Sequence, residues 1–115
     1  MIRHLGSIAE IVEDVEAAVD FYRNVLGVEV KYEEGANYAK VELPGVLHFG
    51  IWQRTFAAEV TFGDAGKLEL IPLGFSLGFE VDDVDTDTEV MEAKGWGFIQ
   101  RPKEEEWGQT TSRFY

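Results

Sequence analysis

The chain has 115 residues, of which 45% are hydrophobic, enough for one domain with a sizeable core. Its 22 Asp and Glu outnumber its ten Lys and Arg, and the net charge of −12 disfavours nucleic acid and anionic membranes as partners. That charge serves either solubility, including in a salty or hot habitat, or the attraction of cationic ligands. The absence of cysteine excludes disulfides and thiolate chemistry. Without a signal peptide or a membrane-length apolar run, we expect a cytoplasmic protein with no membrane partner.

The first predicted elements are a strand over residues 7–12 and a helix over residues 14–26. Asp14 is a good N-cap, and Gly27 can adopt the left-handed conformation that ends a helix. Apolar side chains recur between them at a spacing of three to four residues, which predicts one buried helix face: Val15, Ala18, Val19, Tyr22, Val25 and Leu26.

Three further strands are predicted after this helix. Residues 28–34 and 37–43 alternate like the two strands of a hairpin around Gly35, and residues 46–52 form a third strand after a Pro-Gly turn. The following segment, 56–72, has little Ser or Pro and is predicted to be ordered. The first part of the chain is therefore a strand–helix–strand–strand–strand unit.

The same pattern occurs a second time. Aligning Asp14 with Asp83 places Ser7 on Ser76, and it predicts a second helix over residues 83–94 that ends at Gly95. Two more strands are predicted in "WGFIQR" and "GQTTSRFY". Neither copy can bury both its helix face and its sheet face alone, so we expect the two to associate.

The stretches "IVEDVEAAVDFYRNVLG", "LGFEVDDVD" and "WGQTTSRFY" resemble the glyoxalase, bleomycin-resistance and extradiol-dioxygenase superfamily, also called vicinal oxygen chelate proteins. The resemblance implies an α+β fold of two βαβββ modules, residues 4–55 and 72–115, joined by 56–71. It also implies a cleft between curved sheets and a homodimer with paired sites. The chain ends at Tyr115, where the last strand of the second module would begin, so we expect that strand to be missing.

The resemblance also implies positions for metal ligands. In metal-dependent members they lie at the start of the first strand of each module, here Ser7 and Ser76, and in the last strand of module one, here His48. Serine hydroxyls are poor ligands for a divalent ion, so we expect no metal. The alternative is one Ni, Zn, Fe or Mn ion held by His48, by His4 after a shift in register, and by a glutamate beyond the end of the chain.

Alternation along the strands predicts which side chains line the cleft. Ser76 and Glu80 lie opposite the apolar set of their strand, and the expected ligand-binding residues are Ser7, His48, Trp52, Phe75, Ser76, Glu80 and Trp107. In the first strand the same rule places Glu10 on the core side, where an unpaired carboxylate is costly, so either that strand is short or its register slips by one residue. The charged segment 101–107 is interpreted as solvated surface or as a mobile lid.

Two functions follow from these residues. We expect a non-catalytic protein that binds a small organic molecule, aromatic or cationic, like the drug-sequestering antibiotic-resistance members of the superfamily. The alternative is a metal-dependent lyase, isomerase or dioxygenase of the same fold. Serine at both first-strand positions favours the binding protein, and we expect it to work without a cofactor.

Overall fold

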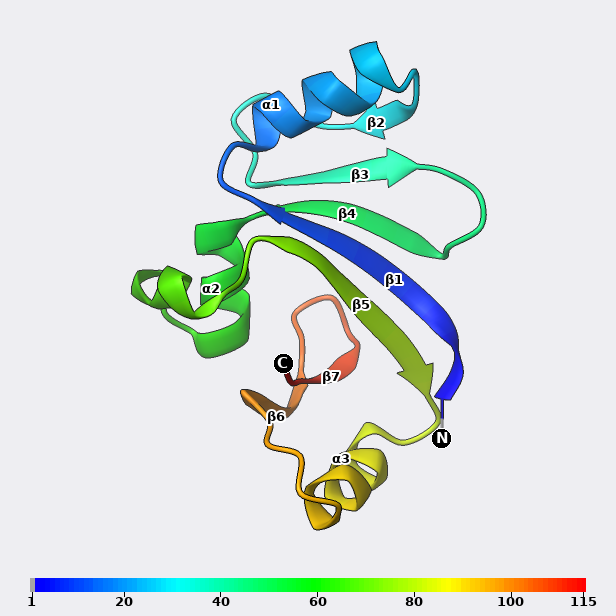
Figure 1. Ribbon diagram of the computed structural model, residues 1–115, viewed down its shortest axis with the longest axis vertical. Helices are drawn as coiled ribbons and strands as arrows, with labels where there is room; N and C mark the ends of the chain where they lie inside the picture. Colours follow the sequence, from blue (N-terminus) through cyan, green and yellow to red (C-terminus); the bar gives the residue numbers. More distant parts are fainter. Residues whose placement is uncertain (1) are drawn as a thin grey trace. The chain divides into compact units, whose positions relative to one another are not determined.

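The computed structural model describes residues 2–115 as a mixed α+β structure with a five-stranded and a two-stranded sheet (Figure 1). Two compact units are distinguished, Leu5–Phe79 and a C-terminal unit of Glu80–Tyr115 with residues 2–4, and each is described by itself. The division falls between Phe79 and Glu80, whereas the sequence suggested modules separated by residues 56–71.

The elements of the N-terminal unit follow the predicted order. They are β1 (Ile2–Val12), α1 (Val15–Asp20), the π-helical turn η1 (Phe21–Val25), β2 (Glu29–Lys31), β3 (Tyr38–Glu42), β4 (His48–Gln53), α2 (Arg54–Phe62), the 3-10 segment η2 (Ala65–Leu70) and β5 (Gly74–Val81). Strand β1 is longer than predicted and β2 is shorter. The predicted ordered segment after β4 is helical, because α2 and η2 occupy most of it.

Helix α1 begins and ends where local chemistry predicts. The Asp14 carboxylate accepts a hydrogen bond from the Ala17 amide at 3.1 Å and so satisfies one of the free N–H groups of the first turn. The helix continues through η1, and Gly27 follows with φ of 69°, a conformation that costs a glycine little. The prediction of a helix over residues 14–26 is confirmed.

The five-stranded sheet has the order β2-β3-β4-β1-β5 (Figure 1). Strands β2, β3 and β4 are antiparallel neighbours, and β4 pairs in parallel with β1. Strand β5 joins the sheet beside β1, where Gly78 lies against Ser7. A Cβ atom on Gly78 would be 2.0 Å from Ser7 Oγ, so glycine allows this approach while the Ser7 side chain keeps its position.

The main core lies between α1 and one face of this sheet. Its central residue is Ile51 of β4, which is fully buried, and burial of a side chain of this size contributes roughly 1.5–3 kcal/mol. The other buried members of this cluster are Val15, Val19, Tyr22, Val30, Ala39 and Val41. A second cluster joins β1 to α2 through Ile11, Ala57, Ala58 and Ile71.

Glu10 lies on the core side of β1, and its carboxylate is paired there. The Tyr22 hydroxyl donates a hydrogen bond to Glu10 Oε1 at 2.8 Å. Burial, together with this bond and the negative charge of Glu10, raises the pKa of Tyr22 to about 12. The register predicted from alternation is therefore correct, and neither a short strand nor a shift by one residue is needed.

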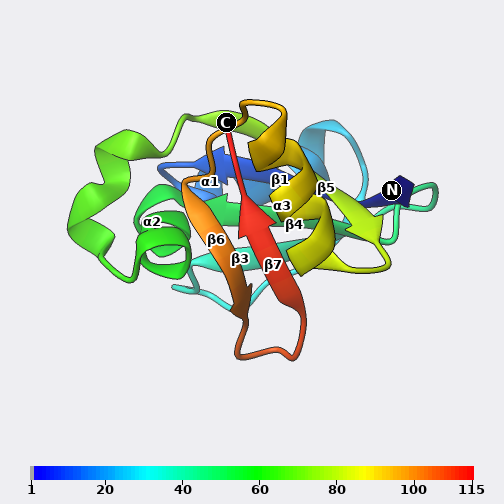
Figure 2. The ribbon, with the colours of Figure 1, turned by 90° about the horizontal axis from the view of Figure 1, so that it is seen from below.

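The C-terminal unit holds α3 (Val84–Ala93), β6 (Gln100–Glu104) and β7 (Thr110–Arg113). Asp83 caps α3 by accepting from the Thr86 amide at 3.1 Å, which confirms the second predicted helix. Figure 2 shows β6 and β7 as a hairpin with α3 beside it. The buried Thr88 hydroxyl of α3 donates to the Val84 carbonyl at 2.7 Å and lies 2.9 Å from Ser112 Oγ of β7, so the helix is tied to the hairpin.

One strand predicted for the second half of the chain was wrong in extent. The strand expected in residues 96–101 begins only at Gln100 and runs to Glu104, and the rings of Trp96 and Phe98 pack on Phe114. The segment 101–107 is therefore mostly strand. Strand β5, which precedes α3 in the chain, is hydrogen-bonded into the first sheet beside β1.

Candidate functional site

One face of the five-stranded sheet brings three of the expected site residues together. Ser7 of β1 is the register partner of His48 of β4, and Ile11 is the partner of Trp52. Side chains of paired residues lie on the same face, and every second residue returns to it, so Ser7, His48 and Trp52 share one face. We call this the Ser7–His48 face. His48 is exposed, and Ser7 and Trp52 are half-buried.

Ser76 of β5 lies on the Ser7–His48 face as well. The missing side chain of Gly78 would point at Ser7 Oγ, which places Gly78 on that face, and Ser76 is two residues earlier in the same strand. Two hydroxyls and one imidazole are thus presented from three adjacent strands. The two serines aligned in the sequence repeat thus lie on neighbouring strands and on the same face of the sheet.

Aromatic rings cover the neighbouring part of this face. A Cβ atom on Gly50 would lie 2.8 Å from Trp52 Nε1 and 2.9 Å from Tyr38 Cε2, so both rings lean over the glycine. The Trp52 ring centroid is 6.0 Å from that of Tyr38 and 5.1 Å from that of Phe56. Burial, with a smaller effect of the Glu42 carboxylate, raises the pKa of Tyr38. Sequence reasoning missed Tyr38 and Gly50, although the alternation of the hairpin strands could have indicated them.

The β2–β3 edge of this face carries balanced charge. Lys40 and Glu42 alternate with buried residues along β3, as Tyr38 does. Glu42 Oε1 forms an ion pair with Lys31 Nζ at 3.2 Å and lies 3.9 Å from Lys40 Nζ; this oxygen is buried and makes no hydrogen bond, so the contact is electrostatic. Because two ammonium groups share one carboxylate, this edge is less acidic than the chain as a whole.

Phe75 lies on the opposite face of the sheet from Ser76. Its ring centroid is 6.5 Å from that of Phe49, which is in turn 5.7 Å from the ring of Tyr22 on the helix side. The side chain is 63% exposed. The structure therefore does not bring Phe75 to the Ser7–His48 face, because adjacent residues of a strand point in opposite directions.

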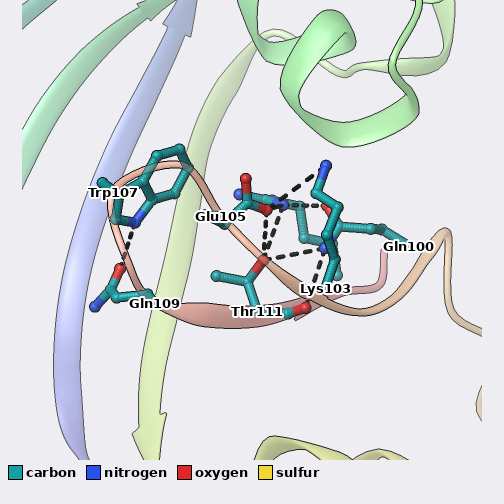
Figure 3. Close-up of polar contacts among 7 residues, drawn as sticks. Gln100, Lys103, Glu105, Trp107, Gln109 and Thr111 are labelled. Carbon is teal, nitrogen blue, oxygen red and sulfur yellow. Dashed lines mark hydrogen bonds and ion pairs between the residues drawn. The ribbon is translucent and has the colours of Figure 1, made fainter.

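Glu80 and Trp107 belong to the C-terminal unit, where Gln109 connects them. Trp107 Nε1 donates to Gln109 Oε1 at 2.8 Å (Figure 3), and Gln109 Nε2 donates to Glu80 Oε1 at 3.5 Å. We call these three residues the Trp107 group. Sequence reasoning missed Gln109, whose position two residues after Trp107 was the available signal.

The turn that carries Trp107 is fixed by Glu105. Glu105 Oε1 accepts from the Thr111 hydroxyl at 2.8 Å and from Arg113 Nη1 at 2.9 Å, and Lys103 Nζ lies 3.8 Å away (Figure 3). Burial alone would raise the pKa of Glu105, but the hydrogen bonds from Arg113 and Thr111 outweigh it and hold the pKa below its usual value. The lid suggested for residues 101–107 is thus an anchored hairpin.

The residues available do not fit a three-ligand metal site. The Ser7–His48 face offers one imidazole and two neutral hydroxyls, whereas divalent ions prefer imidazole, carboxylate or thiolate in sites of this kind. Strand β1 runs without interruption from Ile2, so His4 lies about 10 Å from Ser7 and on the other side of the strand. Among residues 2–115 no group of three His, Cys, Asp or Glu side chains could hold a metal ion.

Two surface hollows lie in the N-terminal unit. One, of about 590 Å³, borders α1 and is lined by Asp14, Glu16, Ala17, Val19, Asp20, Arg23, Asn24, Tyr32 and Glu34. The other, of about 360 Å³, borders the β3–β4 connection and is lined by Lys40, Val41, Glu42, Leu43, Pro44, Val46, Leu47 and Phe49. Neither contains Ser7, His48 or Ser76.

In the described part of the chain, no helix has the length and apolar character needed to cross a membrane.

The arrangement of these elements is that of an α+β protein with a glyoxalase-like fold. Residues 5–115 match the model of the glyoxalase-like domain family, and the chain belongs to that family. The resemblance noted in the sequence is therefore confirmed. Among curated proteins the comparison gives no match.

Solved structures share the fold at low sequence identity. A hypothetical protein from Bacillus halodurans C-125 is 13% identical, with a TM-score of 0.66 over 97% of this chain and 83% of that one. A variant of Streptomyces coelicolor methylmalonyl-CoA epimerase bound to 2-nitronate-propionyl-CoA is 17% identical, with a TM-score of 0.65 over 100% and 86%. Methylmalonyl-CoA epimerase from Mycobacterium tuberculosis is 17% identical, with a TM-score of 0.65 over 99% and 79%. At these identities the likeness describes the fold.

Proposed function

We propose that this chain is a non-catalytic, cytoplasmic member of the glyoxalase-like family that binds a small planar organic molecule, neutral or cationic, on the Ser7–His48 face. The observation that carries the proposal is the register of β1, β4 and β5, which presents Ser7, His48 and Ser76 beside the ring of Trp52. Hydroxyl and imidazole groups can each donate or accept a hydrogen bond and so orient a polar substituent. An adjacent indole supplies a flat apolar surface for stacking.

The chemistry of the donor set supports binding over catalysis. One imidazole with two hydroxyls lacks the ligands of a metal-dependent lyase or dioxygenase. The ligand in one epimerase neighbour is a CoA derivative, and CoA carries several negatively charged phosphate oxygens. A net charge of −12 opposes such an anion, so we do not extend that ligand, or nucleic acid, to this chain.

We also propose that the protein is a homodimer. Phe75, Leu77 and Phe79 of β5 are 63%, 56% and 46% exposed, and β5 is the last strand of its sheet within residues 2–115. An apolar edge strand is a ready surface for pairing with another chain, and a strand can pair antiparallel with its own copy across a two-fold axis. A second copy of this chain could cover the exposed apolar side chains of β5 and also form backbone hydrogen bonds along its edge.

The binding proposal is tested by calorimetric titration with quinoline, a planar neutral probe, in wild type and in Trp52→Leu. Saturable binding that weakens about tenfold in Trp52→Leu, which corresponds to about 1.4 kcal/mol, is the expected result. Trp96→Leu is the matched control, since Trp96 is a tryptophan of the C-terminal unit. Metal analysis is the second arm. One equivalent of Ni, Zn, Fe or Mn per chain, lost with an activity on chelation, would overturn the proposal in favour of a metal-dependent enzyme.

A further inference from the structure

The Trp107 group presents an aromatic ring whose polar atom is already bonded. The indole N–H of Trp107 donates to Gln109, and the side chain as a whole is still 50% exposed. A ligand that meets this residue therefore meets the ring rather than the N–H. The face of an indole ring carries negative electrostatic potential and attracts cations more strongly than that of Tyr or Phe.

Glu80 adds a carboxylate to this ring that has no basic partner in the protein. Within residues 2–115 no Lys or Arg forms an ion pair with Glu80, and its contact is the Gln109 amide at 3.5 Å. The basic residues of the hairpin are bonded elsewhere, because Arg101 pairs with Glu92, and Lys103 and Arg113 pair with Glu105. The half-buried Glu80 thus keeps an uncompensated negative charge.

The hairpin holds Trp107 and Gln109 in a fixed arrangement. The Glu105 amide donates to the Gln109 carbonyl at 2.7 Å, and the Gly108 amide donates to the Glu105 carbonyl at 2.9 Å, which closes a tight turn around Trp107. Gly108 has φ of 98°, which a side chain would oppose. Since the Glu105 side chain is itself bonded to Arg113 and Thr111, little ordering remains to be done when a ligand binds.

We propose that the Trp107 group is a subsite for an organic cation, a quaternary or protonated amine, in which Trp107 and Glu80 contact the charged nitrogen. Gln109 is the positioning residue, because its amide holds the indole through Oε1 and the carboxylate through Nε2. This inference rests on the proposed function, from which it takes the class of small planar organic ligand, and it assigns a preference for the cation to the C-terminal unit taken by itself. The carboxylate supplies charge complementarity and the ring supplies a cation–π contact.

The test compares two probes of nearly the same shape, N-methylquinolinium and quinoline, by calorimetry at neutral pH, where quinoline is uncharged. The wild-type protein is expected to bind the cation more tightly than the neutral probe. Glu80→Gln, Trp107→Leu and Gln109→Leu are each expected to lower affinity for the cation about tenfold and to leave affinity for quinoline unchanged. If Gln109 had a purely structural role, Gln109→Leu would weaken the binding of both probes alike. A change in the ratio of the two affinities therefore reports the positioning role of Gln109.

Matched controls come from the same unit. Glu104→Gln changes an exposed acid of the hairpin, and Trp96→Leu changes a tryptophan that is 57% exposed and packs on Phe114. Both should keep the preference for the cation. If Trp107→Leu does not fold, Trp107→Phe replaces it, with a smaller expected loss.

Failure of this inference differs from failure of the proposed function. Equal wild-type affinity for the two probes, or cation affinity indifferent to all three substitutions, overturns the subsite. Quinoline binding that still depends on Trp52 would then leave the proposed function standing. Binding of neither probe overturns both.

Discussion

Replacement of Gly78 by alanine tests the contact on which the Ser7–His48 face depends. The new Cβ atom would lie 2.0 Å from Ser7 Oγ and 3.3 Å from Ser7 Cβ, so the Ser7 side chain must leave its position or the strands must separate. Overpacking of this kind typically costs about 1–3 kcal/mol. We expect Gly78→Ala to lower the free energy of unfolding by that amount.

The Ser7→Ala background removes the atom that clashes. The nearest remaining side-chain atom is then Ser7 Cβ at 3.3 Å, a tight contact that a shift of a few tenths of an ångström relieves. We expect Gly78→Ala to cost less than about 1 kcal/mol in this background, with a coupling energy of about 1–2 kcal/mol between the two sites. Urea unfolding at equilibrium, analysed for midpoint and slope, supplies all four corners of the cycle.

Gly97→Ala is the matched control, because a Cβ atom there meets nothing within 4 Å and the backbone does not require glycine. It should be neutral or stabilise by up to about 1 kcal/mol, since alanine restricts the unfolded chain more than glycine does. Equal destabilisation by Gly78→Ala in the wild-type and Ser7→Ala backgrounds would refute the placement of Gly78 against Ser7. It would also remove Ser76 from the Ser7–His48 face.

Three further predictions concern stability and assembly. Glu105→Gln should lower the free energy of unfolding by about 1.5–3 kcal/mol at neutral pH, because hydrogen bonds to a charged carboxylate are stronger than those to an amide. Since folding lowers the pKa of Glu105, the difference in stability between wild type and variant should shrink as the pH falls through that pKa. A difference that does not change with pH would contradict this prediction. Tyr22→Phe should cost about 1–2 kcal/mol by leaving Glu10 without its partner. Because the pKa of Tyr22 is raised to about 12, wild type should lose that advantage as the pH rises from about 10 towards 12, and alkaline unfolding curves that stay parallel would argue against the pairing. Leu77→Asp should convert a dimer into a monomer in sedimentation equilibrium at micromolar concentration, and a wild-type chain that sediments as a monomer would refute the proposed assembly.

The local features of this protein were determined by short stretches of sequence. Asp14 and Asp83 cap their helices, and Gly27 follows the first helix with a left-handed backbone, as predicted. These signals are readable because a cap, a turn and an amphipathic period each involve residues that are close along the chain. Alternation also assigned the faces of β1 and β5, so the sides of these strands on which Ser7 and Ser76 lie were within reach of the sequence.

The tertiary structure decided the contacts that join distant residues. The sequence alone could not show that the Tyr22 hydroxyl donates a hydrogen bond to the Glu10 carboxylate and so offsets the cost of placing it on the core side, because Tyr22 comes from the helix that packs on the sheet. Nor could it show that β5 extends the first sheet, since strand pairing depends on which backbone edge is free. Gln109 acquired its role in the same way, by lying within hydrogen-bond reach of both Trp107 and Glu80. The sequence determined what each segment could form, and burial and backbone pairing between segments determined which side chains meet.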